Sequence, residues 1–144
     1  MSEFYVSVGA ATSFSKTVGE YDVFAFAGIS GDFAPNHVNR AYMQKSGYKD
    51  LIAHGALLVG YMSTASTQMA MAARADAGVT GVSLGYDRVR FLAPVYFGDT
   101  ITVDYRIAAI DPGKLRASAD IKITNQDGTL VAVATHLLKW VRNA

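Results

Sequence analysis

Residues 54–78 read HGALLVGYMSTASTQMAMAARADAG and form the longest helical pattern in the chain. A glycine stands near each end, at Gly55 and Gly78. Apolar residues recur at helical spacing along one stripe, which consists of Leu58, Met62, Ala65, Met69 and Ala72. A second face carries Val59, Ser63, Ser66 and Ala70, which are all small or weakly polar. The helix as a whole is therefore predominantly apolar. Such helices are usually buried on every side, and we expect a sheet to wrap this one.

The other long patterns are those of strands. In TITVDYRIA, residues 100–108, apolar and polar side chains alternate, which is typical of a strand with one buried face. The turn sequences DPG at 111–113 and DG at 127–128 separate the last three strands and predict an antiparallel meander. The last strand is apolar on both faces, which indicates an interior position. The predicted strands span 11–18, 82–94, 99–110, 115–124 and 130–141.

Two short helices are expected before the long one. The first runs over about 19–27, and Thr17 with Glu20 three residues later resembles a capping box. The second is RAYMQKS, with Asn39 as a plausible N-cap and Gly47 as the residue that ends it.

Length and charge narrow the class of protein. The 144 residues suit one domain over 1–144, and a long helix followed by an antiparallel sheet is an α+β arrangement. Thirteen Lys and Arg against 12 Asp and Glu give a net charge of +1, too small to favour nucleic acid or a membrane surface. The absence of cysteine excludes disulfides and thiolate-bound metals. We expect no secretory signal and no membrane span, and therefore a cytoplasmic protein.

The surface is expected to be partly covered by another subunit. Hydrophobic residues make up 51% of the chain and charged residues 17%, below the usual charged fraction of about 25%.

The loop GISGDFAPNHVN, residues 28–39, places Asp32 and His37 five residues apart. The two side chains could form a general acid–base pair, because histidine titrates near neutral pH and a neighbouring carboxylate fixes its tautomer. Alternatively, Asp32 caps a turn and His37 packs, as is common in such loops. The spacing alone leaves both interpretations open.

The first turn of the long helix offers a second candidate group. The backbone N–H of Gly55 lies at the positive end of the helix dipole and could bind a developing thioester enolate oxygen; alternatively, Gly55 only permits close packing. His54 could orient the loop or cap the helix, and we expect such a structural role for it. We expect a core or interface role for His136. The three histidines lack a metal-binding spacing such as HExxH, so no metal is expected.

Ser63 and two arginines are weaker candidates for a role in catalysis or substrate binding. No GxSxG surrounds Ser63, so it is not a predicted nucleophile; it could orient the acid–base pair or be a plain helix serine. Arg88 and Arg90 share a strand face and could bind the phosphates of a coenzyme A carrier, or be a solvated face. There is no GxGxxG or Walker A motif, and no cofactor is expected.

Two segments together resemble the MaoC-like hot-dog family. They are ISGDFAPNHVNRAYMQKSGYKDLIAHGALLVGYMS, residues 29–63, and VRFLAPVYFGDTITV, residues 89–103. The (R)-specific enoyl-CoA hydratases of that family have a G-D-x-N-P-aliphatic-H pattern, then AHG at the start of the long helix, then a P-V-x-x-G-D turn. The resemblance covers about residues 8–141.

The resemblance implies a hot-dog fold, an antiparallel sheet around one long helix, and a hydro-lyase activity. The reaction would be the reversible hydration of a trans-2-enoyl-CoA to an (R)-3-hydroxyacyl-CoA, with acyl-CoA as substrate. Asp32 and His37 match the catalytic pair, Gly55 the donor to the thioester oxygen, and Ser63 a helix serine that helps arrange the site. A homodimer is implied, with the acyl tunnel near the subunit interface.

The chain departs from the family pattern beside the catalytic pair. Ala34 replaces the usual Asn, and Asn36 replaces an aliphatic residue, so Asn36 could take over that hydrogen bonding or contact a polar substrate group. Ser66 and Ala70 keep one helix face small, which suggests room for an acyl chain or a branched or ring-bearing acid.

Two other functions remain open. Hot-dog acyl-CoA thioesterases use an acid on or near the long helix, but no acid follows Gly55 until Asp76. A non-catalytic acyl-CoA-binding or partner subunit is compatible with Ala34. A dehydratase acting on a carrier-protein thioester would be a near relative of the first proposal.

Overall fold

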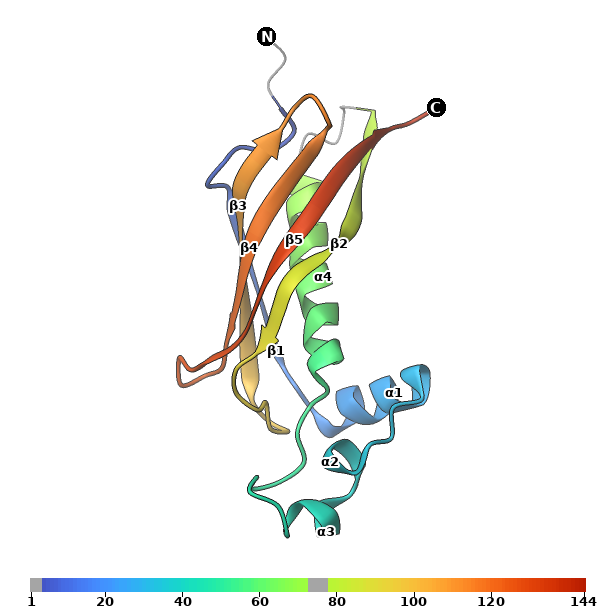
Figure 1. Cartoon of the computed structure of the whole chain (residues 1–144), viewed down its shortest axis with the longest axis vertical. Helices are drawn as coiled ribbons and strands as arrows, with labels where there is room; N and C mark the ends of the chain where they lie inside the picture. Colours follow the sequence, from blue (N-terminus) through green and yellow to red (C-terminus); the bar gives the residue numbers. More distant parts are fainter. Residues whose placement is uncertain (1–3, 73–77) are drawn as a thin grey trace.

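The computed structural model describes residues 4–72 and 78–144. Five strands form one antiparallel sheet in the order β1-β3-β4-β5-β2, and the long helix α4 lies along one face of it (Figure 1). This is the predicted α+β hot-dog arrangement. The strands are β1 (Ala11–Thr17), β2 (Val79–Phe91), β3 (Thr100–Asp111), β4 (Arg116–Thr124) and β5 (Leu130–Arg142). The helices are α1 (Glu20–Ser30), α2 (Pro35–Val38), α3 (Arg40–Met43) and α4 (Gly55–Ala72).

The predicted strands are confirmed to within a few residues at each end. The meander β3–β4–β5 is also confirmed, and β5 lies in the interior of the sheet, between β4 and β2. Local alternation did not indicate that β2 pairs with β5 and lies at one edge of the sheet, while β1 lies at the other. Both pairings join segments far apart in the chain.

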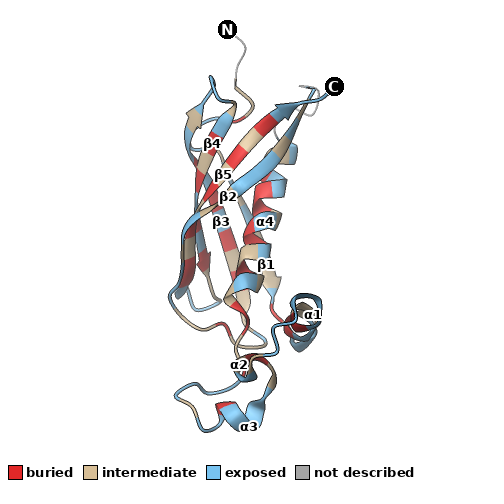
Figure 2. Ribbon diagram, turned by 45° about the vertical axis from the view of Figure 1, so that its right-hand side comes forward, coloured by how far each residue is buried: buried red, intermediate tan, exposed pale blue. Residues whose placement is uncertain are grey.

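Helix α4 buries one face only. Its buried residues are Leu58, Tyr61, Met62, Ala65, Ser66 and Met69. The opposite side is exposed along Gly60, Ser63, Thr67 and Met71 (Figure 2). The expectation of burial on every side is therefore wrong for the single chain, because the sheet covers the helix from one side. Of the predicted helix, residues 73–77 lie outside the described residues. In the described ranges no helix is both long enough and apolar enough to cross a membrane.

The start of α1 differs from the prediction. Its N-cap is Gly19, whose N–H donates to Asp22 Oδ2 at 2.8 Å. The hydroxyl of Thr17 lies 2.7 Å from that of Thr100 on the neighbouring strand. The predicted capping box of Thr17 and Glu20 is therefore wrong, because Thr17 belongs to β1 and its hydroxyl is hydrogen-bonded within the sheet.

Helix α3 is shorter than predicted. Asn39 is its N-cap as expected, and its side chain accepts a hydrogen bond from the Tyr42 N–H at 3.0 Å. The helix nevertheless ends at Met43, so the expectation that Gly47 terminates it is wrong. The Ser46 hydroxyl donates to the Met43 carbonyl at 2.7 Å and satisfies that end of the helix.

A buried polar group lies between the sheet and α4 at His136. The side chain is 0% exposed, with Nδ1 2.7 Å from the Tyr105 hydroxyl and Nε2 2.8 Å from the Ser83 hydroxyl. The ring of Tyr86 stacks on it at 4.6 Å. The predicted core role of His136 is confirmed. Burial lowers the pKa of His136 from 6.5 to about 4, because the charged ring would lose its hydration.

We predict that stability falls as the pH is lowered from about 6.5 to about 4. In that range the unfolded chain binds a proton at His136 that the folded protein does not bind. The loss is on the order of 3 kcal/mol, at about 1.4 kcal/mol for each unit between the two pKa values. Urea unfolding at several pH values should show a shallower dependence in His136→Gln than in the original chain. Parallel pH profiles for the two proteins would contradict this expectation.

Candidate active site

Local sequence explains how Asp32 and His37 are held beyond the end of the sheet. Gly31 ends α1 in the left-handed conformation, with φ 81°, and its N–H donates to the Ala27 carbonyl at 2.8 Å. The chain then turns at Asp32 and enters α2, which begins with Pro35, a residue favoured at the first helical position. His37 lies on this single turn of helix, which the sequence pattern did not predict. In Figure 1, α1, α2 and α3 lie below the sheet, near the start of α4.

Two buried histidines join this segment to the entrance of α4. His37 is 7% exposed, and its Nδ1 lies 2.8 Å from the Ile52 carbonyl oxygen. His54 is 1% exposed, and its Nε2 lies 2.9 Å from the Asp32 carbonyl oxygen. Because a carbonyl only accepts, each of these nitrogens carries the proton. In the neutral rings, Nε2 of His37 and Nδ1 of His54 therefore keep a free lone pair.

The acid and the two rings converge. The two imidazoles stack with centroids 3.7 Å apart and an interplanar angle of 25°. One carboxylate oxygen of Asp32 and one ring nitrogen from each histidine all lie within 4.8 Å of one another. A water molecule could bridge groups at this separation and lose a proton to the pair. Metal coordination fits less well, because lone pairs of stacked rings lie in nearly parallel planes and do not converge on one ion.

The start of α4 forms one wall of a cavity of about 380 Å³. Gly55, His37 and Asn36 line it, together with Phe91 and Leu58. The Gly55 N–H makes no backbone hydrogen bond within 4–72 and 78–144, as expected for the first turn of a helix. A side chain at Gly55 would overlap the exposed ring of Phe91. The glycine therefore lets the Phe91 ring pack directly against the backbone beside this N–H.

The loop holds its shape although Ala34 replaces the family's asparagine. The Ala34 N–H donates to Asp32 Oδ1 at 3.2 Å, and the Asp32 N–H donates to the Ser30 hydroxyl at 3.2 Å. The backbone carbonyl of Asn36 accepts from the Ile52 N–H at 3.0 Å. Its side chain lines the cavity and forms no hydrogen bond with the described part of the chain.

The two candidate serines of α4 lie away from this cavity in the single chain. Ser63 is eight residues past Gly55, or about 12 Å along the helix at ~1.5 Å a residue. Ser66 is buried, and its hydroxyl donates to the Ser63 carbonyl at 2.8 Å. The buried Tyr86 hydroxyl faces both serines but makes no hydrogen bond of standard geometry with the described residues. Burial raises the pKa of Tyr86, and the serine hydroxyls oppose that effect.

Sequence reasoning offered a loop-orienting role for His54 but did not identify the atom that it contacts. The bond to the Asp32 carbonyl agrees with the structural role expected for His54, but it spans 22 residues, and no local pattern encodes a pairing of that length. The only sequence feature that pointed to a role of His54 near the site was its position directly before Gly55.

Among known proteins, the chain is similar to hydratases of one family. Residues 6–131 match the MaoC like domain family. An (R)-specific enoyl-CoA hydratase of Rhodospirillum rubrum is 34% identical over 109 residues, which are 76% of this chain and 71% of that protein. An (R)-specific enoyl-CoA hydratase of Aeromonas caviae is 30% identical over 139 residues, 96% of this chain and 98% of that one.

The solved structures agree with the sequence relatives. An (R)-hydratase from A. caviae involved in PHA biosynthesis superimposes with a TM-score of 0.82 at 28% identity, covering 93% of this chain and 96% of that one. The family match covers most of the chain, from before β1 to the start of β5. The chain belongs to the MaoC-like domain family, which includes (R)-specific hydratases of enoyl thioesters.

Proposed function

We propose that this protein catalyses the reversible hydration of a trans-2-enoyl-CoA to an (R)-3-hydroxyacyl-CoA. The observation that carries the proposal is the convergence of the Asp32 carboxylate and the His37 ring beside a cavity that also reaches the Gly55 N–H. The (R)-specific hydratases among the relatives support the reaction class. No acid lies on α4 between Gly55 and Ala72, so the thioesterase alternative gains no support.

The reaction requires three functions, and the site offers a group for each. Asp32 and His37 hold a water molecule, and the lone pair on His37 Nε2 takes one of its protons as the oxygen bonds to C3 of the enoyl thioester. The electron pair of the double bond moves to the thioester oxygen, where the Gly55 N–H and the helix dipole stabilise the negative charge. The pair then returns a proton to C2. One water is added in total, and no electron acceptor is needed.

The proposed assembly is a homodimer. The exposed face of α4 carries small residues along Gly60, Ser63 and Thr67, which suits close contact with a second helix. The edge strand β2 leaves backbone groups unpaired on its outer side and exposes Val82 and Leu84. A second copy covering both surfaces would bury the polar helix face around Ser63, where the acyl chain is expected.

We predict that Asp32→Asn and His37→Gln each lower kcat by at least about 10²-fold, because each removes one half of the water-activating pair. The assay is the loss of the conjugated thioester absorbance of crotonyl-CoA and longer enoyl-CoAs. Asp127→Asn, a change of the same kind on the exposed β4–β5 turn, serves as the control. Near-original rates in either site variant would refute the mechanism, and release of free thiol instead of hydration would support a thioesterase.

We predict that Gly55→Ala lowers kcat/KM by about tenfold or more, because the added methyl group would collide with the Phe91 ring and stand beside the oxyanion donor. The double variant Gly55→Ala/Phe91→Ala distinguishes two roles of this glycine, which are access to the N–H donor and accommodation of the Phe91 ring. If Gly55 serves only to accommodate the Phe91 ring, removing that ring should restore activity to the level of Phe91→Ala alone. We expect no such restoration in steady-state kinetics.

We predict a particle of twice 15.4 kDa in sedimentation equilibrium. Gly60→Glu should shift the population towards monomer, because it places a charge on the exposed face of α4. Asn125→Glu, on the distant β4–β5 turn, should not. A monomer at all concentrations in the original protein would contradict the dimer.

A further inference from the structure

A groove of about 460 Å³ on the outer face of the sheet is lined by three cationic side chains. Arg88 and Arg90 come from β2 and Lys122 from β4, and all three are exposed. The groove contains one carboxylate, that of Asp120. Three positive charges against one negative leave a net of two positive charges. None of the three cations forms an ion pair within 4.0 Å in the described ranges.

A β-bulge brings the two arginines to the same groove. From Asp87 to Arg90, β2 advances three residues while β5 advances two, from Thr135 to Val133. Arg88 is the residue at this irregularity and has φ 52°, which is uncommon for a residue other than glycine. Its guanidinium donates to the Thr135 hydroxyl at 3.1 Å, which fixes the side chain on the outer face. Bulges often re-aim side chains next to active sites.

The groove lies close to the reaction cavity along one strand. Phe91 faces inward and lines the cavity beside Gly55, whereas its neighbour Arg90 faces outward into the groove. Arg88 is three residues from Phe91, or about 10 Å at ~3.3 Å a residue. The cavity and the groove meet at the Phe91 end of β2, so a flexible chain that leaves the cavity there can pass the end of the strand and reach the outer face.

The reaction cavity itself offers no positive charge. None of the residues found to line it is an arginine or a lysine. Nearby Arg40 is engaged by Glu20 and Asp50, each at 3.3 Å. Lys49 lies over the Tyr96 ring at 4.6 Å and is the competing cation. A substrate that carries phosphate groups therefore requires a separate surface to bind them.

We propose that the groove formed by Arg88, Arg90 and Lys122 binds the phosphates of the coenzyme A part of the thioester. This rests on the proposed function only for the identity of the ligand. Guanidinium groups form charge-assisted, bidentate hydrogen bonds with phosphate, and the net charge of the groove matches that of a diphosphate. The pantetheine arm links this surface to the reacting carbons.

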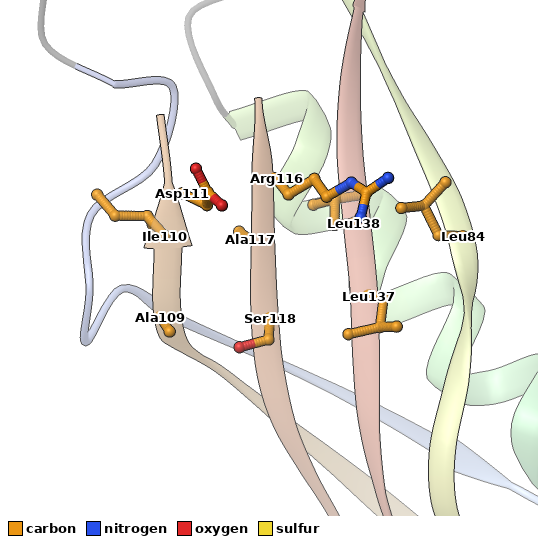
Figure 3. A pocket seen from close by; sticks show the side chains of 9 residues that line it. All are labelled: Leu84, Ala109, Ile110, Asp111, Arg116, Ala117, Ser118, Leu137 and Leu138. Atoms are coloured by element: carbon orange, nitrogen blue, oxygen red, sulfur yellow. The ribbon is translucent and has the colours of Figure 1, made fainter. Parts of the chain in front are cut away.

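A second depression on the outer face provides the comparison (Figure 3). Leu84, Leu137 and Ile110 line it, and Arg116 and Asp111 supply one charge of each sign. An apolar hollow without net charge has no preference for phosphate. Arg116 is six residues from Lys122 along β4, or about 20 Å at ~3.3 Å a residue, and is a matched control on the same face.

The test is the double variant Arg88→Gln/Arg90→Gln, with Arg116→Gln as control and thermal melting to verify folding. We expect the KM for crotonyl-CoA and the Kd for coenzyme A by titration calorimetry to rise about tenfold, with kcat within about twofold. Crotonyl-pantetheine, which has no phosphate, should show the same KM in all three proteins. Raising the salt concentration should weaken coenzyme A binding in the original chain more than in the double variant.

Three results would overturn the assignment. They are an unchanged Kd for coenzyme A in the double variant, an equal loss with crotonyl-pantetheine, or a larger loss in Lys49→Gln than in the double variant. An equal loss with crotonyl-phosphopantetheine would also count against coenzyme A, because carrier-protein thioesters bear that single phosphate. Coenzyme A binding that depends on the arginines, without turnover of any enoyl-CoA, would support the groove and refute the hydratase.

Discussion

Two hydrogen bonds from buried histidines to backbone carbonyls hold the site together. His54 on the entrance of α4 donates to Asp32, and His37 on α2 donates to Ile52 before α4. Each segment therefore holds the other, and each bond also leaves the opposite ring nitrogen as the free base. Removing either ring would leave a buried carbonyl without its partner, at a cost of about 1–3 kcal/mol. Acid, base and helix terminus consequently keep one relative geometry.

The elements that the sequence predicted well are those with a strong local pattern. Strand β3 alternates over its whole length, and the turns after β3 and β4 carry glycine with aspartate, so the meander could be predicted from neighbouring residues. The position of β2 beside β5 depends on pairing between distant segments. Helix α2 is one turn long, too short for any periodicity. The exposed face of α4 carries small residues such as Gly60, Ser63 and Thr67, and its exposure depends on how far the sheet of one chain extends.

The site was predictable where its residues form a local sequence pattern. Asp32, His37 and Gly55 stand in a recognisable order along the chain, and the structure brings their segments to one cavity. The contact between His54 and Asp32 joins residues 22 positions apart and has no local signature. Ser63 and Ser66 were expected near the same chemistry, yet the helix rise carries them away from the cavity. Their hydroxyls instead face Tyr86 across the inner side of the sheet.

In the proposed assignment, strand β2 serves two ends of one substrate that have opposite needs. The reacting end of an enoyl thioester needs a cavity with little water, where one N–H stabilises an enolate strongly. A cation beside the imidazole would repel the proton that the ring has to accept, so positive charge is better kept away from His37. The alternation of a strand meets both conditions, because Phe91 turns toward Gly55 while Arg90 turns to the outer face. Separating the charges by the thickness of the sheet would allow the proposed phosphate binding without weakening His37 as the base.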